Sequence, residues 1–134
     1  MASLEPSPVT PAQSRPIRLL VVEDHRDTAR MLWLLLAGSS YEVKSAGDAA
    51  TALDLAAQES FDLLISDIGL PDQTGYDLMK AIRERYRIKG IALTAYGMQE
   101  DIRKSHEAGF SEHLVKPVEL TTLAKAIQRV LGLE

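Results

Sequence analysis

Five polar side chains in this sequence each stand at the end of a short apolar run. Two acids directly follow the run at 17–22, and a third follows the run at 61–66. A threonine ends the run at 88–94, and a lysine follows the brief run at 113–115. If these runs are parallel strands, their carboxyl ends meet at one edge of a sheet, where ligands bind in such folds. The side chains expected to converge there are Glu23, Asp24, Asp67, Thr94 and Lys116.

This set of groups suits phosphoryl chemistry. Three carboxylates held together repel one another, and a hard divalent cation relieves that repulsion. Mg²⁺ is the natural occupant, because it prefers oxygen ligands and is commonly held by one or two carboxylates and a phosphate. Lys116 adds a positive charge for a carboxylate or for phosphoryl oxygens, and Thr94 adds a hydroxyl donor. Between them, Asp67 would attack a phosphoryl donor and form an acyl phosphate.

Ten short elements must position these groups, and the spacing of the apolar residues predicts each of them. Strands are expected at 17–22, 41–45, 61–66, 88–94 and 113–115. Helices are expected at 27–37, 49–59, 74–86, 98–108 and 119–131. Strict alternation of strand and helix predicts an α/β fold, in which a doubly wound parallel sheet carries helices on both faces and its crossovers are right-handed.

Several helix ends are marked by residue type. Gly38 is expected to close the first helix, because glycine is the usual residue just past a helix end. Asp48 is expected to cap the second helix, with Leu53 and Ala57 facing the core.

The 134 residues are enough for one domain with a substantial core. Residues 1–16 hold four of the six prolines, separated by Ser and Thr, and are expected to be a flexible tail or linker. The predicted domain therefore covers 17–134. With 46% hydrophobic and 25% charged residues, its composition is that of an ordinary globular protein.

Composition also excludes several classes of function. A net charge of −4 with no basic block disfavours direct binding of nucleic acid. The absence of cysteine excludes disulfides, thiolate zinc sites and cysteine nucleophiles, and it fits a reducing compartment. No apolar run approaches the ~20 residues of a membrane span, and no secretory signal is visible. We therefore expect a cytoplasmic protein without membrane contact.

Four segments of the sequence resemble the signatures of the bacterial response-regulator receiver domain. They read VVEDH at 21–25, SDIGLPDQTG at 66–75, LTAYG at 93–97 and LVKPV at 114–118. The resemblance extends over 17–134. The segment DIGLPDQTGYDLM is most similar to that of receivers attached to hybrid sensor histidine kinases. The family resemblance implies a flavodoxin-like (βα)5 fold with a five-stranded sheet in the order 2-1-3-4-5.

The resemblance also implies how a Mg²⁺ ion and a phosphoryl group are held. Asp67 would be the phosphoacceptor and a metal ligand. Asp24 would bind Mg²⁺ directly, Glu23 would act largely through water, and the backbone carbonyl of Gly69 would complete the protein ligands. Glu23 stands where Asp is common in the family, and its extra methylene would shift the metal geometry slightly.

The resemblance also implies which residues would contact the phosphoryl group and which would form a conformational switch. The Thr94 hydroxyl, the Ala95 amide and the Lys116 ammonium would contact the phosphoryl oxygens. The bond between Lys116 and Pro117 would be cis. Thr94 and His113 would form the conformational switch, although many receivers have Tyr or Phe where this sequence has His113.

The implied function is that of a phosphoacceptor in a two-component phosphorelay, without turnover of a separate substrate. The donor would be a phosphohistidine of a histidine kinase or histidine phosphotransfer protein. Output would pass to another protein through residues 98–131, from a monomer or weak dimer. The alternatives are a receiver fragment that regulates a hybrid kinase in cis, a degenerate receiver that binds partners without phosphorylation, and, remotely, a phosphohydrolase with an aspartyl nucleophile.

Overall fold

The structure is a computed structural model that describes residues 15–95 and 99–133. Its strands are β1 (Arg18–Val22), β2 (Glu42–Ala46), β3 (Leu63–Asp67), β4 (Lys89–Thr94) and β5 (Glu112–Val115). Its helices are α2 (Arg26–Ala37), α3 (Ala49–Gln58), α4 (Gly75–Arg85), α5 (Gln99–Ala108) and α6 (Leu120–Leu131). No helix in these two ranges is long and apolar enough to cross a membrane.

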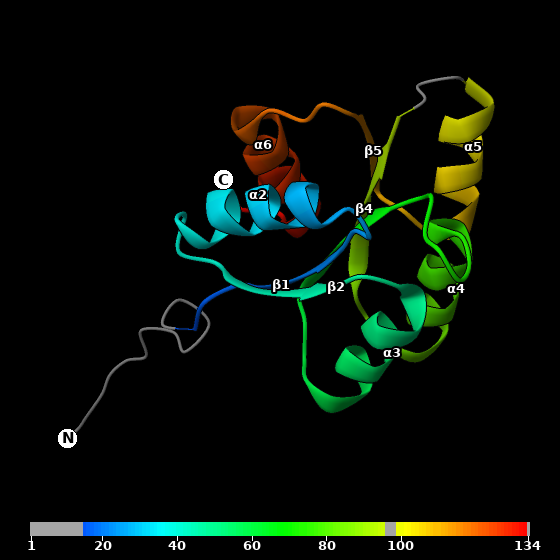
Figure 1. Cartoon of the computed structure of the whole chain (residues 1–134), viewed down its shortest axis with the longest axis horizontal. Helices are drawn as coiled ribbons and strands as arrows, with labels where there is room; N and C mark the ends of the chain where they lie inside the picture. The colour runs from blue at the N-terminus through cyan, green and yellow to red at the C-terminus, as the bar shows by residue number, and fades with distance from the viewer. Residues whose placement is uncertain (1–14, 96–98, 134) are drawn as a thin grey trace.

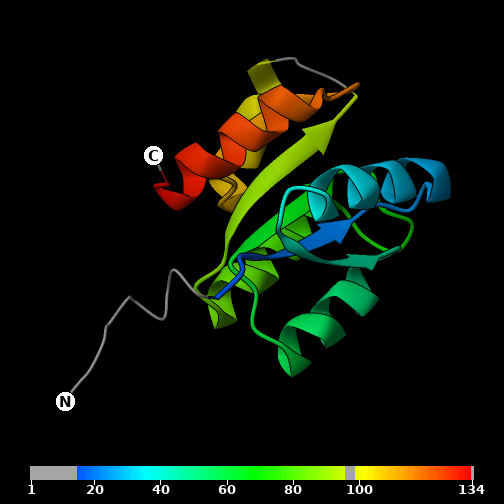
Figure 2. The ribbon, with the colours of Figure 1, turned by 90° about the vertical axis from the view of Figure 1, so that its left-hand side faces the viewer.

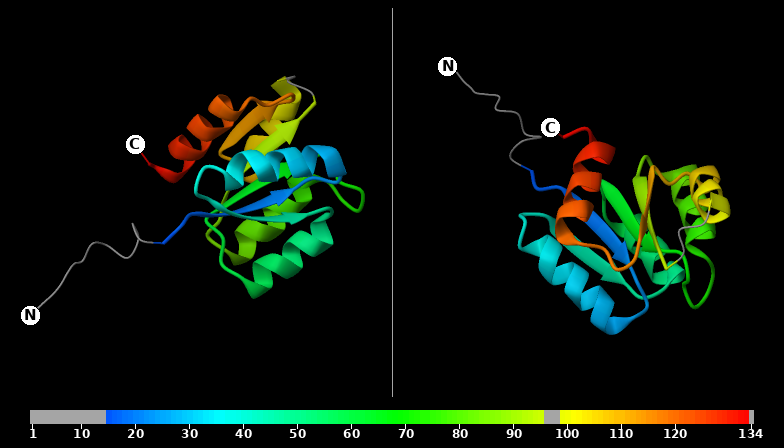
Figure 3. Two further views of the ribbon diagram at one scale, coloured as in Figure 1. Left: turned by 60° about the vertical axis from the view of Figure 1, so that its left-hand side comes forward. Right: turned by 90° about the horizontal axis from the view of Figure 1, so that it is seen from above.

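The strands form one parallel sheet in the order β2-β1-β3-β4-β5, which confirms the predicted fold class and strand order. Helices α2 and α6 cover one face of the sheet, and α3, α4 and α5 cover the other (Figure 1). Turned by a quarter, the molecule shows the sheet between these two helical layers (Figure 2). Further views show α2 and α6 side by side over the strands (Figure 3).

The central strands are buried on both faces, which explains why they are apolar throughout. Leu19 and Val21 of β1 face α2 and α6, whereas Leu20 and Val22 face the opposite layer, and all four are fully buried. A strand with helices on both sides has no solvent face, so its sequence shows a continuous apolar run rather than alternation.

The first helix ends where the sequence predicts, at Ala37, and Gly38 is its C-cap residue. Gly38 follows α2 but keeps right-handed backbone angles, with φ −68°, and the left-handed residue is Ser40, with φ 75°. The amides of Gly38 and Ser39 still bond to carbonyls of the helix, so the turn continues past the glycine. The left-handed residue of this turn thus lies two residues after the glycine that caps the helix.

The second helix confirms one prediction and corrects another. The Asp48 side chain caps α3 by accepting a bond from the Thr51 amide. Leu53 is half-buried and packs against the core as predicted, but Ala57 is exposed, whereas Ala52 and Ala56 are buried. The inner face of α3 is therefore formed by Ala49, Ala52, Leu53 and Ala56, and Ala57 lies outside it. The start predicted at 98 for the fourth helix lies outside the described residues.

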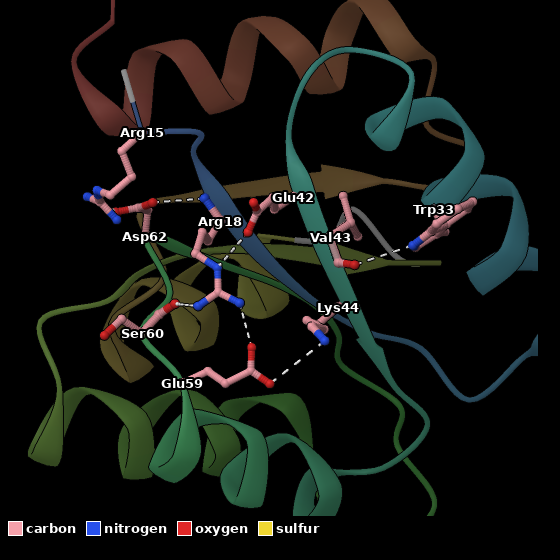
Figure 4. A network of polar contacts seen from close by, with 9 residues as sticks. All are labelled: Arg15, Arg18, Trp33, Glu42, Val43, Lys44, Glu59, Ser60 and Asp62. Atoms are coloured by element: carbon pink, nitrogen blue, oxygen red, sulfur yellow. Dashed lines mark hydrogen bonds and ion pairs between the residues drawn. The ribbon is translucent and has the colours of Figure 1, made fainter. Parts of the chain in front are cut away.

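At the amino end of the sheet, Arg18 joins three segments of chain (Figure 4). Its guanidinium donates to Glu42 on β2, to Glu59 after α3 and to the carbonyl of Ser60. The same group lies 5.1 Å from the centroid of the Phe61 ring. These contacts tie the edge strand β2 and the end of α3 to β1, at the end of β1 remote from the candidate site.

We predict that Arg18→Lys lowers the free energy of unfolding by about 1–2 kcal/mol, because an ammonium cannot serve these acceptors with a planar fork. Urea unfolding measures the change. Arg15→Lys is the matched control: Arg15 is exposed and makes one 3.5 Å contact with Asp62, so its loss should stay below about 0.5 kcal/mol. Equal losses in the two variants would contradict the role given to Arg18.

Candidate functional site

The sheet brings the predicted side chains to one edge. Glu23 and Asp24 follow β1, Asp67 is the last residue of β3, and Lys116 directly follows β5. Glu23, Asp24 and Asp67 each place a carboxylate oxygen within 4.8 Å of the others. The expected convergence is therefore confirmed, and it arises because neighbouring parallel strands end together.

Lys116 links two of the three acids. Its Nζ lies 2.8 Å from Oε1 of Glu23 and 3.1 Å from Oδ2 of Asp67. The second oxygen of Glu23 accepts a bond from the amide of His25 at 3.2 Å. Glu23 is only 2% exposed, so both of its carboxylate oxygens are bonded within the protein.

Burial and hydrogen bonding have opposite effects on the pKa values of Glu23 and Lys116. Burial raises the pKa of Glu23, and the nearby charge of Asp67 raises it further, while the hydrogen bond from Lys116 lowers it. Burial alone would lower the pKa of Lys116, but its bonds to Glu23 and Asp67 outweigh this and raise that pKa. Lys116 is therefore charged at neutral pH and compensates part of the negative charge around it.

The donor set fits a Mg²⁺ ion. The cluster offers only carboxylate oxygens, the hard ligands that Mg²⁺ prefers. Because Glu23 is buried and bonded to Lys116 and His25, the carboxylates best placed to bind a cation directly are Asp24, which is exposed, and Asp67. Glu23 is placed to act on such an ion through water.

The loop between β3 and α4 borders Asp67. The Gly69 amide lies 3.3 Å from Oδ1 of Asp67, and Gly69 forms an isolated bridge with Thr74. A Cβ at Gly75 would lie 2.4 Å from the carbonyl oxygen of Asp67. Only glycine therefore lets α4 begin directly against the end of β3. Thr74 caps that helix by accepting a bond from the Asp77 amide.

Thr94 and Ala95 stand at the same edge. Thr94 ends β4, is buried, and accepts a bond from the Lys116 amide through its carbonyl at 2.7 Å. Ala95 is exposed, and the peptide bond between Lys116 and Pro117 is cis, as the resemblance implied. The remainder of the LTAYG segment, Tyr96 and Gly97, lies outside the described residues.

His113 contacts α5 through a hydroxyl group. Its Nδ1 lies 2.8 Å from Oγ of Ser105, which is buried in α5. His113 pairs with Ala92 on β4, two residues before Thr94 pairs with Val115. His113 is half-buried, and its contact with Ser105 links β5 to α5.

Two polar residues of this region were not singled out by the sequence. Ser105 has no motif around it, and its role follows from the contact with His113 alone. Asp72 lies within the segment SDIGLPDQTG, but its partners are amides of α3, about twenty residues earlier in the chain. An acid in a loop gives no signal of such a distant partner.

Comparisons with known proteins agree on one family. The model of the response regulator receiver domain matches residues 19–128. A 14.6 kDa protein of Leptolyngbya boryana is 35% identical, covering 83% of this chain and 87% of that protein. The response regulator PilR of Pseudomonas aeruginosa is 33% identical over 87% of this chain, and the sensor histidine kinase RcsC of Salmonella typhimurium is 31% identical over 81%. The chain spans only 26% of PilR and 12% of RcsC.

Solved structures give the same result. The chemotaxis protein CheY4 of Vibrio cholerae has a TM-score of 0.84 and 33% identity, covering 87% of this chain and all of that one. In a co-crystal from Saccharomyces cerevisiae, a histidine phosphotransfer protein, Ypd1, accompanies the receiver domain of the response regulator Ssk1. The match to that structure has a TM-score of 0.82 and 27% identity, covering 87% of this chain and 90% of the other.

We predict that Lys116→Met lowers the free energy of unfolding of the metal-free protein by about 2 kcal/mol at pH 7, since the buried Glu23 loses its cation. The pKa of Glu23 in the folded protein then rises further above its unfolded value. Protonation at low pH relieves the penalty, so the loss measured by urea unfolding should be larger at pH 8 than at pH 5.

The double variant Glu23→Gln with Lys116→Met is the control for this pH dependence. Without the buried carboxylate, the difference between the two pH values should disappear. A loss that is equal at pH 5 and pH 8 in Lys116→Met alone would show that Glu23 is not the group left unpaired.

Proposed function

This chain belongs to the response regulator receiver domain family of two-component signalling, and on that premise we propose that Asp67 accepts a phosphoryl group from a phosphohistidine. The observation that carries the proposal is the pairing of the Lys116 ammonium with Asp67, beside two further carboxylates. An acceptor carboxylate needs positive charge next to it, because the incoming group is itself an anion.

In the proposed reaction, a carboxylate oxygen of Asp67 attacks the phosphorus atom, and the bond from phosphorus to the histidine nitrogen breaks. Asp24, Asp67 and the carbonyl of Gly69 would hold Mg²⁺, with Glu23 acting through water, and a bound ion would neutralise charge on the transferred group. Lys116 would turn from the Asp67 carboxylate to a phosphoryl oxygen. The Thr94 hydroxyl and the Ala95 amide would donate to the other oxygens.

The output would travel through the contact between His113 and Ser105. Drawing Thr94 toward the new phosphoryl group opens space beside β4, and His113 can move only if it leaves the Ser105 hydroxyl. Because Ser105 belongs to α5, this exchange would alter the surface at 98–131 that we propose contacts a downstream protein. The phosphoryl group adds nearly two negative charges, enough to bias such a two-state element.

We favour a phosphoacceptor over an enzyme that turns over a separate substrate. A phosphohydrolase with an aspartyl nucleophile would use similar groups, but Asp67 has no second acid two residues away in the sequence. The similarity to RcsC supports a second reading, in which this receiver regulates a hybrid kinase in cis. The lack of cysteine fits a reducing compartment, so we place the reaction in the cytoplasm.

A groove beside Lys116 would be a suitable docking surface for the phosphodonor. A groove of about 320 Å³ lies between α2 and the segment after β5, and Met31, Leu35, Pro117 and Val118 contribute to its lining. Lys116 also lines it, so the groove is continuous with the acceptor. Met31 is 59% exposed there. A helix that carries phosphohistidine and an adjacent apolar stripe would fit, as in a histidine phosphotransfer protein.

We predict that incubation with acetyl phosphate and Mg²⁺ adds one labile phosphoryl group to the protein, detected by intact mass. Asp67→Asn should abolish the adduct while leaving the fold intact, because the amide is not a nucleophile. Omission of Mg²⁺ should also abolish it. A phosphorylated Asp67→Asn protein would overturn the acceptor assignment, whereas turnover of a phosphomonoester substrate would favour the phosphohydrolase.

A second prediction separates the donor surface from the chemistry. Met31→Glu should slow transfer from a phosphorylated histidine phosphotransfer protein by about tenfold, since a charge replaces an apolar contact worth ~1–2 kcal/mol. Labelling by acetyl phosphate should stay unchanged. Ile102→Glu is the matched control, because Ile102 is 45% exposed on α5 and lies away from the groove. Equal slowing in both variants would contradict this docking surface.

A further inference from the structure

Asp72 joins the loop that follows β3 to the first turn of α3. Its Oδ1 accepts a bond from the Ala49 amide and its Oδ2 a bond from the Ala50 amide, both at 3.0 Å. Oδ1 also accepts from the amide of Gln73. The amide bonds from Ala49 and Ala50 lower the pKa of Asp72, so the carboxylate is ionised at neutral pH.

These bonds exceed what α3 needs from a single N-cap. The helix already has Asp48, whose side chain accepts from the Thr51 amide at 2.7 Å. One local residue usually supplies a helix cap. Here a second carboxylate takes the remaining amides at the first turn, and it comes from a loop that is distant in sequence. The contact therefore fixes the loop as much as it stabilises the helix.

The fixed loop is the one that carries Gly69. At its base, the Gly75 amide bonds to the Ile68 carbonyl at 2.8 Å, and Gly69 bridges to Thr74. At its outer end, Asp72 holds α3. Gly69 thus lies between two anchors, with its amide 3.3 Å from Oδ1 of the acceptor Asp67. A loop held only at its base would be free to move Gly69 relative to that carboxylate.

We propose that Asp72 is a positioning residue for the Mg²⁺ and phosphoryl site, which it orders by clamping the loop that bears Gly69 onto the first turn of α3. The inference rests on the proposed function, because the clamp matters only if the edge binds a cation. Asp72 itself touches neither the ion nor the phosphoryl group. It acts by keeping the backbone of the loop in place before the ion arrives, as outer-shell groups do at other metal sites.

The test compares Asp72→Ala with Asp48→Ala in the full chain. Both variants remove a carboxylate from the same helix end, so a purely structural role predicts similar losses of thermal stability and similar Mg²⁺ binding. We expect the Mg²⁺ dissociation constant, measured by calorimetry, to rise about threefold to tenfold in Asp72→Ala, near the lower end of outer-shell effects. In Asp48→Ala it should change less than about twofold. Asp72→Asn retains one acceptor oxygen and should lie between Asp72→Ala and the wild type.

Amide hydrogen exchange in the metal-free protein supplies a readout that needs no ligand. Exchange at the Leu70 amide, which bonds to the Ile68 carbonyl within the loop, should quicken in Asp72→Ala and stay unchanged in Asp48→Ala. Equal Mg²⁺ affinity in the two alanine variants, or equal exchange at Leu70, would overturn the positioning role. A wild-type protein that binds no Mg²⁺ would instead overturn the proposed function, and this role with it.

Discussion

The ammonium group of Lys116 allows this molecule to keep three acids at one edge of its sheet. Glu23 is buried, and without a cation within bonding distance its charge would oppose folding. Lys116 directly follows β5 and bonds both to Glu23, just after β1, and to Asp67, at the end of β3, so it links the ends of three strands. In the proposed function, the same ammonium group would also receive the phosphoryl anion.

The geometry behind that interaction is a property of the parallel sheet. Four strands that lie next to one another deliver their last residues to one place, and each strand is held by helices on both faces. The site also depends on a close approach between the start of α4 and the end of β3. At Gly75 even a methyl group would collide with the carbonyl of Asp67. The position of Asp67 thus depends on where α4 can begin, and not on the acidic residues alone.

Much of this could be predicted from the sequence, because it depends on local patterns. Buried strands show as apolar runs, and the strand ends then identify Glu23, Asp24, Asp67, Thr94 and Lys116 as neighbours. Sequence reasoning failed where tertiary packing decides. It turned Ala57 inward, whereas the alanines that pack into the core are Ala52 and Ala56. It also passed over Asp72 and Ser105, whose partners lie on other elements.

The contacts of Arg18 at the amino end of β1 bear on which positions of this fold can change in sequence. Around Arg18 the charges are matched, and the guanidinium donates to three acceptors in two neighbouring segments, β2 and the end of α3. At the opposite end, acids outnumber the single ammonium that holds them. The charges are balanced at the Arg18 end of the sheet, whereas the negative charge at the opposite end is only partly compensated. Substitutions around Arg18 can therefore change the stability of the fold without altering the charge balance among Glu23, Asp24, Asp67 and Lys116 at the opposite end.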